Sequence, residues 1–400
     1  MKKTFALLNF FYTAAFSPNW ACGVTFLFFS ALAGICRADV DTGLDIRGRA
    51  YNSSNPAYTT DEASRNFFDQ RTRFYLKGML KENINCEMTI QNTGLWGQEN
   101  NDKLFFERTN IKAEEFFSLP ASVILGKQGC KIGEGLLVND ENTGLSGIKI
   151  DSRLPLGFNA SAAAFKLIET SSETFSGGER DNDVYFATLG RKIFGGEFAV
   201  AYFTDVNKTS STATQQTLID IRYESAVSGE LKWSWEFAKS IGDKKGLDTS
   251  ALIVRVKAFG NIAKLGKGNA FLVYAKGKEG FKPSTSHIAE YEETGEYYMK
   301  NRESGRSNSI ENLQLMGAGA KARTKFIPVD IFFNYFDYGL AAADLAGKTK
   351  LGRETDYGLL YSYTDNLKFR FVYSIFSPGE AMIENGKKNE QILFETNLFF

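Results

Sequence analysis

The chain ends on the stretch QILFETNLFF (residues 391–400), in which successive side chains alternate between two faces. One face carries Phe394, Thr396, Leu398 and Phe400, and the polar Glu395 lies on the other. A period of two indicates a β-strand with different surroundings on its two sides. Such a strand suits either the last strand of a soluble sandwich or the closing strand of an outer-membrane barrel. In an outer-membrane barrel, the barrel-assembly machinery would recognise the terminal aromatic residue.

Composition favours many short strands. The 400 residues include 37 Gly, 7 Pro, 35 Phe, 17 Tyr and 4 Trp, a mixture that fits strands and turns better than helices. Lys and Arg balance Asp and Glu at 47 each, so the sequence gives no sign of a nucleic-acid partner. Because His287 is the single histidine, a histidine-based metal site or proton relay would rest on one residue. We expect no metal and no cofactor.

The N-terminus has the features of an export signal. Lys2 and Lys3 precede the apolar run GVTFLFFSALAGIC (23–36), and small residues stand before Asp39. We therefore expect residues 1–38 to be a removed signal peptide and residues 39–400 to form a single domain. No other stretch approaches the roughly 20 apolar residues that a membrane helix needs.

Alternation and turn signals predict about 18 strands. Most are close to the about 9–11 residues that a tilted strand needs to cross a bilayer. The expected strands are 44–51, 68–80, 84–96, 103–115, 121–130, 146–155, 158–167, 183–192, 196–205, 216–226, 229–240, 249–259, 268–277, 310–321, 326–338, 354–364, 367–377 and 390–400.

The connections between these segments alternate between short and long. KEN, PLG, IFG and DN are short, whereas stretches such as 52–67, 131–145 and 278–309 are long and polar. A soluble sandwich has no reason to alternate in this way, but a membrane barrel has short periplasmic turns and long extracellular loops. The sequence therefore predicts an all-β, transmembrane antiparallel barrel in the outer membrane of a diderm bacterium.

The two faces of single strands support a lipid-facing and a lumen-facing side. In LKWSWEFAK (231–239), Trp233 and Trp235 share one face, and Lys232 and Glu236 share the other. A lumen of about 18 strands is too wide to be filled by apolar side chains. We therefore expect charged residues to line it.

More cations than acids fall on the expected lumen face, and they concentrate on the first two strands and the last but one. Closure would place these strands in one wall. The expected pore-lining cations are Arg47, Arg49, Arg71, Arg73, Lys77, Lys127, Lys149, Arg153, Arg222, Arg255, Lys257, Lys368 and Arg370, and the acids are Asp45, Asp69, Glu87, Asp151, Asp220 and Glu236. Such a wall either attracts anions and binds carboxylates or pairs its charges into a structural network. Both interpretations stay open.

Enzymatic function has little support in the sequence. His287 lies in the longest connection, without a second histidine or a GxSxG motif, so a serine–histidine mechanism is not indicated. We expect no enzyme, although a barrel enzyme or a surface-adhesion barrel stays an alternative. The same connection carries Glu290, Glu292, Glu293 and Glu296. This acidic run could fold into the pore, bind a cation weakly or remain solvated.

One region resembles the alginate-export family of outer-membrane porins. Its motifs are Leu125, Gly126, Lys127 and Gln128, then Gly133, Glu134, Gly135 and Leu137, then Gly147, Ile148, Lys149, Ile150 and Asp151. An early hairpin in 71–97 is also similar, so the match covers roughly residues 68–155. The resemblance implies a monomeric 18-stranded barrel that passes anionic sugar polymers through a basic pore.

The chain departs from that family near its C-terminus. The short turn DN (365–366) stands where the polymer exporters carry a long periplasmic plug. We therefore predict a general or substrate-selective porin for small anionic solutes or sugar acids, with alginate-type export as the alternative. Phe400 is the expected contact with the assembly machinery, and lipid is the expected surrounding.

Overall fold

A computed structural model describes residues 39–400 except for several connections. The segments left out are 55–64, 98–102, 169–180, 209–213, 229, 242–248, 263–265, 282, 284, 286–294, 297, 299–309 and 383–387. The expected signal peptide therefore lies outside the described residues, as do His287, Glu290, Glu292 and Glu293.

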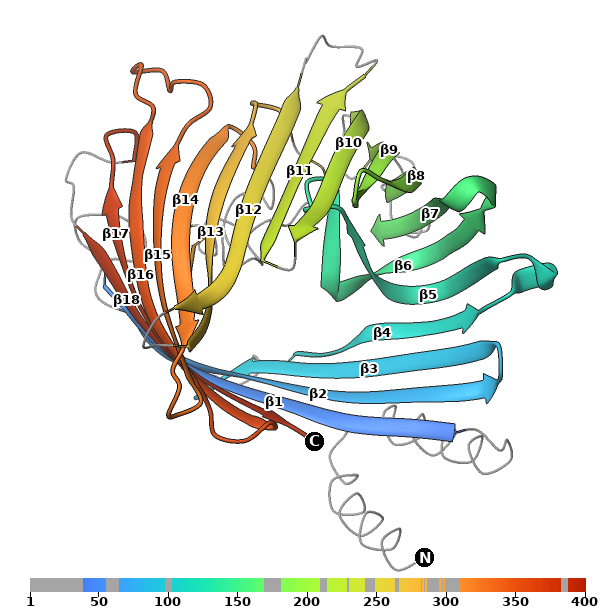
Figure 1. The fold of residues 1–400 in the computed structure, drawn as a ribbon, viewed down its shortest axis with the longest axis horizontal. Helices are drawn as coiled ribbons and strands as arrows, with labels where there is room; N and C mark the ends of the chain where they lie inside the picture. Colours follow the sequence, from blue (N-terminus) through green and yellow to red (C-terminus); the bar gives the residue numbers. More distant parts are fainter. Residues whose placement is uncertain are drawn as a thin grey trace, which may run out of the picture.

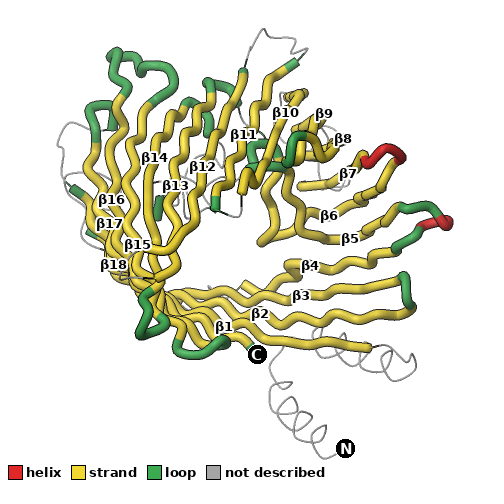
Figure 2. The backbone as a smooth tube through the Cα atoms, in the orientation of Figure 1, coloured by secondary structure: helices red, strands yellow, loops and turns green. Residues whose placement is uncertain are grey.

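The described chain forms 18 strands in one sheet (Figure 1). They are β1 (Asp39–Ser53), β2 (Arg65–Lys81), β3 (Ile84–Leu95), β4 (Lys103–Ala113), β5 (Ala121–Ile132), β6 (Val138–Leu154), β7 (Phe158–Ile168), β8 (Asn182–Ile193), β9 (Gly196–Asn207), β10 (Thr214–Ser228), β11 (Leu231–Ser240), β12 (Ser250–Ile262), β13 (Gly266–Gly277), β14 (Leu313–Arg323), β15 (Val329–Gly339), β16 (Lys350–Ser362), β17 (Leu367–Pro378) and β18 (Asn389–Phe399). Two 3₁₀ turns, η1 (Phe116–Ser118) and η2 (Pro155–Gly157), lie in connections (Figure 2).

The sheet closes on itself. Each strand pairs antiparallel with the next, and β1 pairs antiparallel with β18. The backbone N–H of Phe400 donates to the carbonyl of Leu44 at 2.8 Å, and the N–H of Leu44 donates back at 3.3 Å. Closure gives every described strand a paired neighbour on both sides, as a strand structure in lipid requires. The predicted antiparallel barrel is confirmed.

Apolar side chains cover the outer face. On β18, Ile392 and Phe394 are 42% and 45% exposed, and on β16 Tyr357 and Leu359 are also exposed. These positions alternate with buried residues such as Asp356. The pattern follows from the two-residue period of a strand whose outer face meets lipid.

No helix among the described residues is both long and apolar enough to cross a membrane.

Most predicted boundaries agree with the structure, and the largest difference is at β6. This strand begins at Val138, not at 146, so 131–145 is not a long external loop. The chain instead turns at 133–137, where Gly133 and Gly135 have φ of 55° and 88°. Glycine adopts this left-handed region without the cost that a Cβ would impose, which permits a tight turn.

Part of the lumen is packed with apolar side chains. Leu136, Leu137 and Val138 are fully buried and pack in one cluster with inward-facing residues of the wall, including Phe203 and Ile253. The expectation that so wide a lumen excludes apolar filling is wrong here. The reason is that the chain supplies its own filling, because connecting segments turn inward and bury this surface.

The two cysteines of the barrel lie on different strands and are free. Cys86 lies near the start of β3 and Cys130 near the end of β5, with β4 between these strands. Two strand spacings already amount to about 9–10 Å, whereas a disulfide needs Cα atoms within about 7 Å.

We therefore expect mass analysis of denatured, alkylated, non-reduced protein to find both thiols modified in a monomer. An internal bridge between Cys86 and Cys130 would contradict the strand order.

Candidate functional site

The lumen face of β1 and β2 carries a row of alternating charges. Asp45, Arg47 and Arg49 follow one another at every second position of β1. The β2 residues directly opposite are Arg73, Arg71 and Asp69 respectively. Strands β17 and β18 adjoin this pair through the β1–β18 seam and contribute Lys368, Arg370 and Glu395. We call the lumen face of β17, β18, β1 and β2 the arginine wall.

Most arginines of this wall are paired. Arg49 donates two hydrogen bonds to the Asp69 carboxylate, at 2.8 and 2.6 Å. Arg71 donates to Asp45 at 3.0 Å, and Arg73 lies 3.8 Å from the same carboxylate. Parallel, charge-assisted bonds of this kind fix the side chains as well as neutralise them. The structural-network interpretation therefore describes these three arginines.

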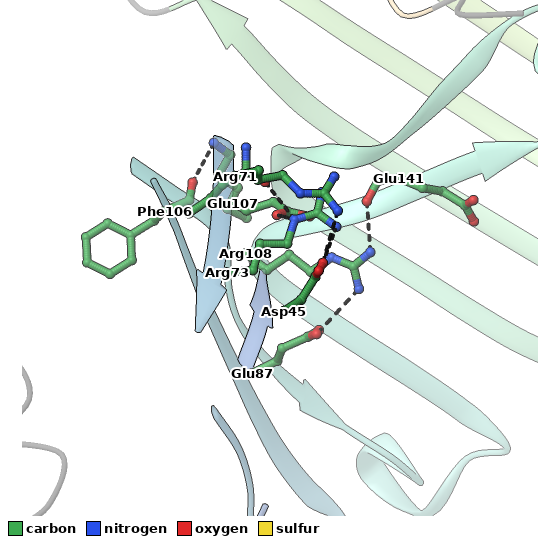
Figure 3. Close-up of polar contacts among 10 residues, drawn as sticks. Asp45, Arg71, Arg73, Glu87, Phe106, Glu107, Arg108 and Glu141 are labelled. Atoms are coloured by element: carbon green, nitrogen blue, oxygen red, sulfur yellow. Dashed lines mark hydrogen bonds and ion pairs between the residues drawn. The ribbon is translucent and has the colours of Figure 1, made fainter. Parts of the chain in front are cut away.

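Glu107 belongs to the same cluster, although its place in the sequence did not indicate this. A β-bulge in the β3–β4 pairing turns both Glu107 and its neighbour Arg108 inward. Glu107 is 3% exposed and lies 2.7 Å from Arg73. Figure 3 shows Glu107 among the charged side chains and the Phe106 ring pointing away from them. Arg108 in turn contacts Glu87 at 3.4 Å.

Arg47 differs from its neighbours. Among the described residues its guanidinium has no hydrogen bond and no ion pair, and its Nε is buried. Arg71 lies directly opposite on β2 and Asn397 directly opposite on β18. The nearby Asp45 and Asp69 are engaged by other arginines. The site therefore holds one guanidinium that is free to bind an anion, flanked by two whose charges are already compensated.

Seven of the remaining expected lumen cations fall into two groups. Four are paired: Lys149 with Asp151 at 3.0 Å, Arg222 with Asp220 at 3.2 Å, Arg255 with Glu134, and Arg370 with Glu296. Three lie against aromatic rings: Lys77 against Tyr75, Lys257 against Phe259 and Lys368 against Phe399. Arg153 is exposed at the end of β6.

Lys127 does not belong to the lumen set. Its partners in the sheet are Thr109 and Ser146, which puts it on the same face as Leu125, a side chain that is 61% exposed. Its ammonium group donates to the carbonyl of Phe106 at 2.8 Å. Its assignment to the pore lining is therefore wrong, because strand alternation places it on the outer face.

Glu296 and Tyr298, described residues of the connection between β13 and β14, lie inside the lumen. The backbone N–H of Glu296 donates to Asp356 at 3.2 Å, and that of Tyr298 donates to Glu354 at 2.9 Å. The Glu296 carboxylate, 2% exposed, pairs with Arg370. We call these contacts of Glu296 and Tyr298 with β16 and β17 the latch.

The β5–β6 turn folds inward too and meets the first segment. The backbone N–H of Glu134 donates to Glu236, whose carboxylate is fully buried on β11. The N–H of Asn139 donates to the carbonyl of Thr285 at 2.8 Å, and the Thr285 hydroxyl donates to the carbonyl of Leu137 at 2.7 Å. Both segments therefore narrow the lumen from the side of β10–β17.

Comparison with known proteins identifies the fold. The crystal structure of Pseudomonas aeruginosa OpdK with vanillate is similar at a TM-score of 0.62 and 10% identity, covering 90% of this chain and 98% of that one. Acinetobacter baumannii OccAB4 gives 0.61 and 9%, with the same two coverages. P. aeruginosa OccK3 (OpdO) gives 0.61 and 14%, covering 94% and 99%.

These structures are outer-membrane porins, and this chain has their fold. No family model matches the chain, and no curated protein matches it in sequence. The resemblance to the alginate-export family in particular is therefore not confirmed.

Proposed function

We propose that the protein is an outer-membrane channel for the diffusion of small anionic solutes, chiefly carboxylates. The observation that carries this proposal is Arg47, an arginine without an ion pair among the described residues in a wall of otherwise paired arginines. A planar guanidinium matches the two oxygens of a carboxylate and can bind both.

The paired neighbours make the binding reversible. A pore conducts when a solute binds well enough to enter and weakly enough to leave. Arg49 and Arg71 add positive charge beside Arg47, but Asp69 and Asp45 compensate it. A carboxylate at Arg47 therefore contacts one uncompensated guanidinium and not a cluster of three. Its binding is correspondingly weaker and easier to reverse.

The similar structure of OpdK contains vanillate, a small aromatic carboxylate. This supports the same class of solute for the present chain. The narrowed lumen also suits small solutes better than a folded polymer, so we favour a porin over an exporter. We further propose that residues 1–38 direct export, that the barrel lies in the outer membrane as a monomer, and that Phe400 contacts the assembly machinery.

The test is Arg47→Gln in planar bilayers. With a salt gradient across the membrane, we expect the native barrel to favour anions and the variant to lose most of that preference. Benzoate should reduce the chloride current of the native channel and have a much weaker effect on the variant. Lys348→Gln, which removes the same charge from the β15–β16 connection, is the control and should leave both measurements unchanged.

An unchanged reversal potential in Arg47→Gln at low salt would show that the wall has only a structural role. Low salt is needed because the Debye length falls from about 10 Å at 0.1 M to about 3 Å at 1 M.

A further inference from the structure

The outer face of the barrel carries an arginine at the short-turn end of β8. Arg191 alternates with Tyr185 and Leu189, which are each 46% exposed, so it shares their lipid-facing side. It stands two residues before the end of this strand, beside the turn that joins β8 to β9. A cation on the lipid face is costly at the middle of the bilayer and is tolerated near an interface. The position of Arg191 therefore suits the interface of the periplasmic leaflet.

Aromatic residues mark the same level on the outer face. The strand register aligns four residues in one row, Phe158 on β7, Arg191 on β8, Phe198 on β9 and Tyr223 on β10. Trp233 on β11 extends the row, because its ring centre lies 5.0 Å from that of Tyr223. Membrane barrels carry girdles of aromatic residues at their two interfaces. Arg191 is thus a cation within such a girdle, at the depth of the phospholipid headgroups.

The guanidinium of Arg191 is oriented without the use of its hydrogen-bond donors. Its Cζ lies 5.1 Å from the centre of the Phe158 ring, and it makes no ion pair with any other described residue. Lys166, an outer-face cation at the opposite end of β7, instead pairs with Asp181 and Asp183 at 2.7 and 3.6 Å. A cation–π contact requires none of the N–H groups of an arginine. These groups can therefore bind oxygen atoms outside the protein.

The adjacent turn presents an apolar side chain at the same rim. Phe194 is 94% exposed and has φ of 50°. This left-handed conformation is unfavourable for a bulky residue, and Asn or Gly usually adopts it in a two-residue hairpin. The Tyr223 hydroxyl donates to the carbonyl of Phe194 at 3.1 Å, which holds the turn against the aromatic row. Because local folding favours another residue here, the phenylalanine is better explained by a contact with lipid.

We propose that Arg191 and Phe194 form an outer-surface site for one anionic phospholipid of the periplasmic leaflet. Arg191 binds the phosphate, whose oxygens match a planar guanidinium, and Phe194 contacts the apolar part of the lipid beside the headgroup. A zwitterionic headgroup also carries an ammonium group. The described outer faces of β7–β10 hold no carboxylate at this end to receive it, so the site favours a headgroup with net negative charge.

The experiment is native mass spectrometry of the intact barrel in detergent at low salt, with phosphatidylglycerol and phosphatidylcholine as separate probes. We expect the first phosphatidylglycerol to bind at least about fivefold more tightly than phosphatidylcholine, which corresponds to about 1 kcal/mol for one cation at an anionic surface. Arg191→Gln should lose this preference. The matched control is Arg353→Gln, which removes an outer-face arginine that already pairs with Asp337 at 3.4 Å and should keep the preference.

Phe194→Asn separates lipid binding from folding. Asparagine tolerates the left-handed backbone, so heat-modifiable migration in gels should show a barrel at least as stable as the native one. Both phospholipids should nevertheless bind severalfold more weakly, because the apolar contact does not depend on headgroup charge. A phenylalanine with only a structural role would give the opposite result, an altered stability with unchanged lipid binding.

Inorganic phosphate distinguishes a lipid from a free anion as the ligand. It shares the anionic group but lacks the acyl chains, so it should not displace phosphatidylglycerol. The proposal is overturned if phosphate does displace the lipid, if the native barrel binds both phospholipids equally, or if the preference survives in Arg191→Gln. The channel proposal is tested separately, because Arg47→Gln should keep the lipid preference and Arg191→Gln should keep the ion selectivity of the pore.

Discussion

Replacing Arg370 with glutamine should widen the channel and raise its single-channel conductance severalfold. Arg370 is the cation that pairs with Glu296 in the latch, where the carboxylates of Glu354 and Asp356 already hold the backbone of the same segment. Without Arg370, the Glu296 carboxylate would stay buried beside two other acids. Its release into water at the long-loop end relieves that cost.

The magnitude follows from the burial of the pair. Removing one partner of a buried ion pair costs about 3–5 kcal/mol, and each 1.4 kcal/mol changes an equilibrium tenfold. The side chains of Arg370 and Glu296 are 13% and 1% exposed, so the pair belongs to the buried class. The latched state should therefore lose its dominance over states in which the segment has left the lumen.

The control for this prediction is Lys368→Gln. Lys368 lies two residues earlier on the same face of β17, and its ammonium group lies 5.7 Å from the Phe399 ring centre. This variant removes the same lumen charge without touching the latch. If Arg370→Gln and Lys368→Gln change conductance equally, the effect comes from charge and the latch does not restrict the pore.

The second large effect is expected from replacing Arg47, Arg49, Arg71 and Arg73 together with alanine. The reversal potential in a salt gradient should change sign, from anion to cation preference. The change removes four cations and leaves Asp45, Asp69 and Glu107 without the arginines that contact them. Charges at a narrow, partly desolvated site act on ions more strongly than charges at an open surface.

A variant with seven substitutions tests whether the three remaining carboxylates cause the cation preference. Adding Asp45→Asn, Asp69→Asn and Glu107→Gln to the four alanine substitutions should return the channel to weak selectivity. The preference of the four-fold variant should also shrink toward 1 M salt, where the Debye length is about 3 Å. A four-fold variant that keeps anion preference at low salt would show that selectivity is set elsewhere. Heat-modifiable migration should confirm that both variants form barrels.

Much of the fold could be predicted because lipid imposes a simple rule on the sequence. Every strand must be long enough to cross, must alternate and must pair on both sides. The alternation in stretches such as LKWSWEFAK and the short turns PLG and DN therefore located the strands. Closure then brought Arg47, Arg49, Arg71 and Arg73 together without any knowledge of side-chain contacts.

The interior of the barrel was less predictable. The two-residue period shows that a strand has two different faces, but it does not show whether a face contacts lipid, water or another segment of the chain. The apolar run GLLV (135–138) indicates burial, but burial inside the barrel and burial in lipid look alike in sequence. The bulge that turns Glu107 inward shifts the alternation by one residue, and no residue type marks it. Lys127 shows the converse error, in which charge suggested the lumen although alternation with Leu125 placed the residue outside.

The pairing of β1 with β18 couples the stability of each strand to that of all the other strands in the closed sheet. The chain has two ends, but the sheet has none, because Leu44 and Phe400 exchange backbone hydrogen bonds like any other pair. A strand that left this ring would expose two unpaired edges to lipid, where each unsatisfied group costs several kcal/mol. Partial melting is therefore as unfavourable at the seam as at any hairpin. Cooperativity, which in a soluble domain comes from a shared core, here comes from the absence of any first or last strand.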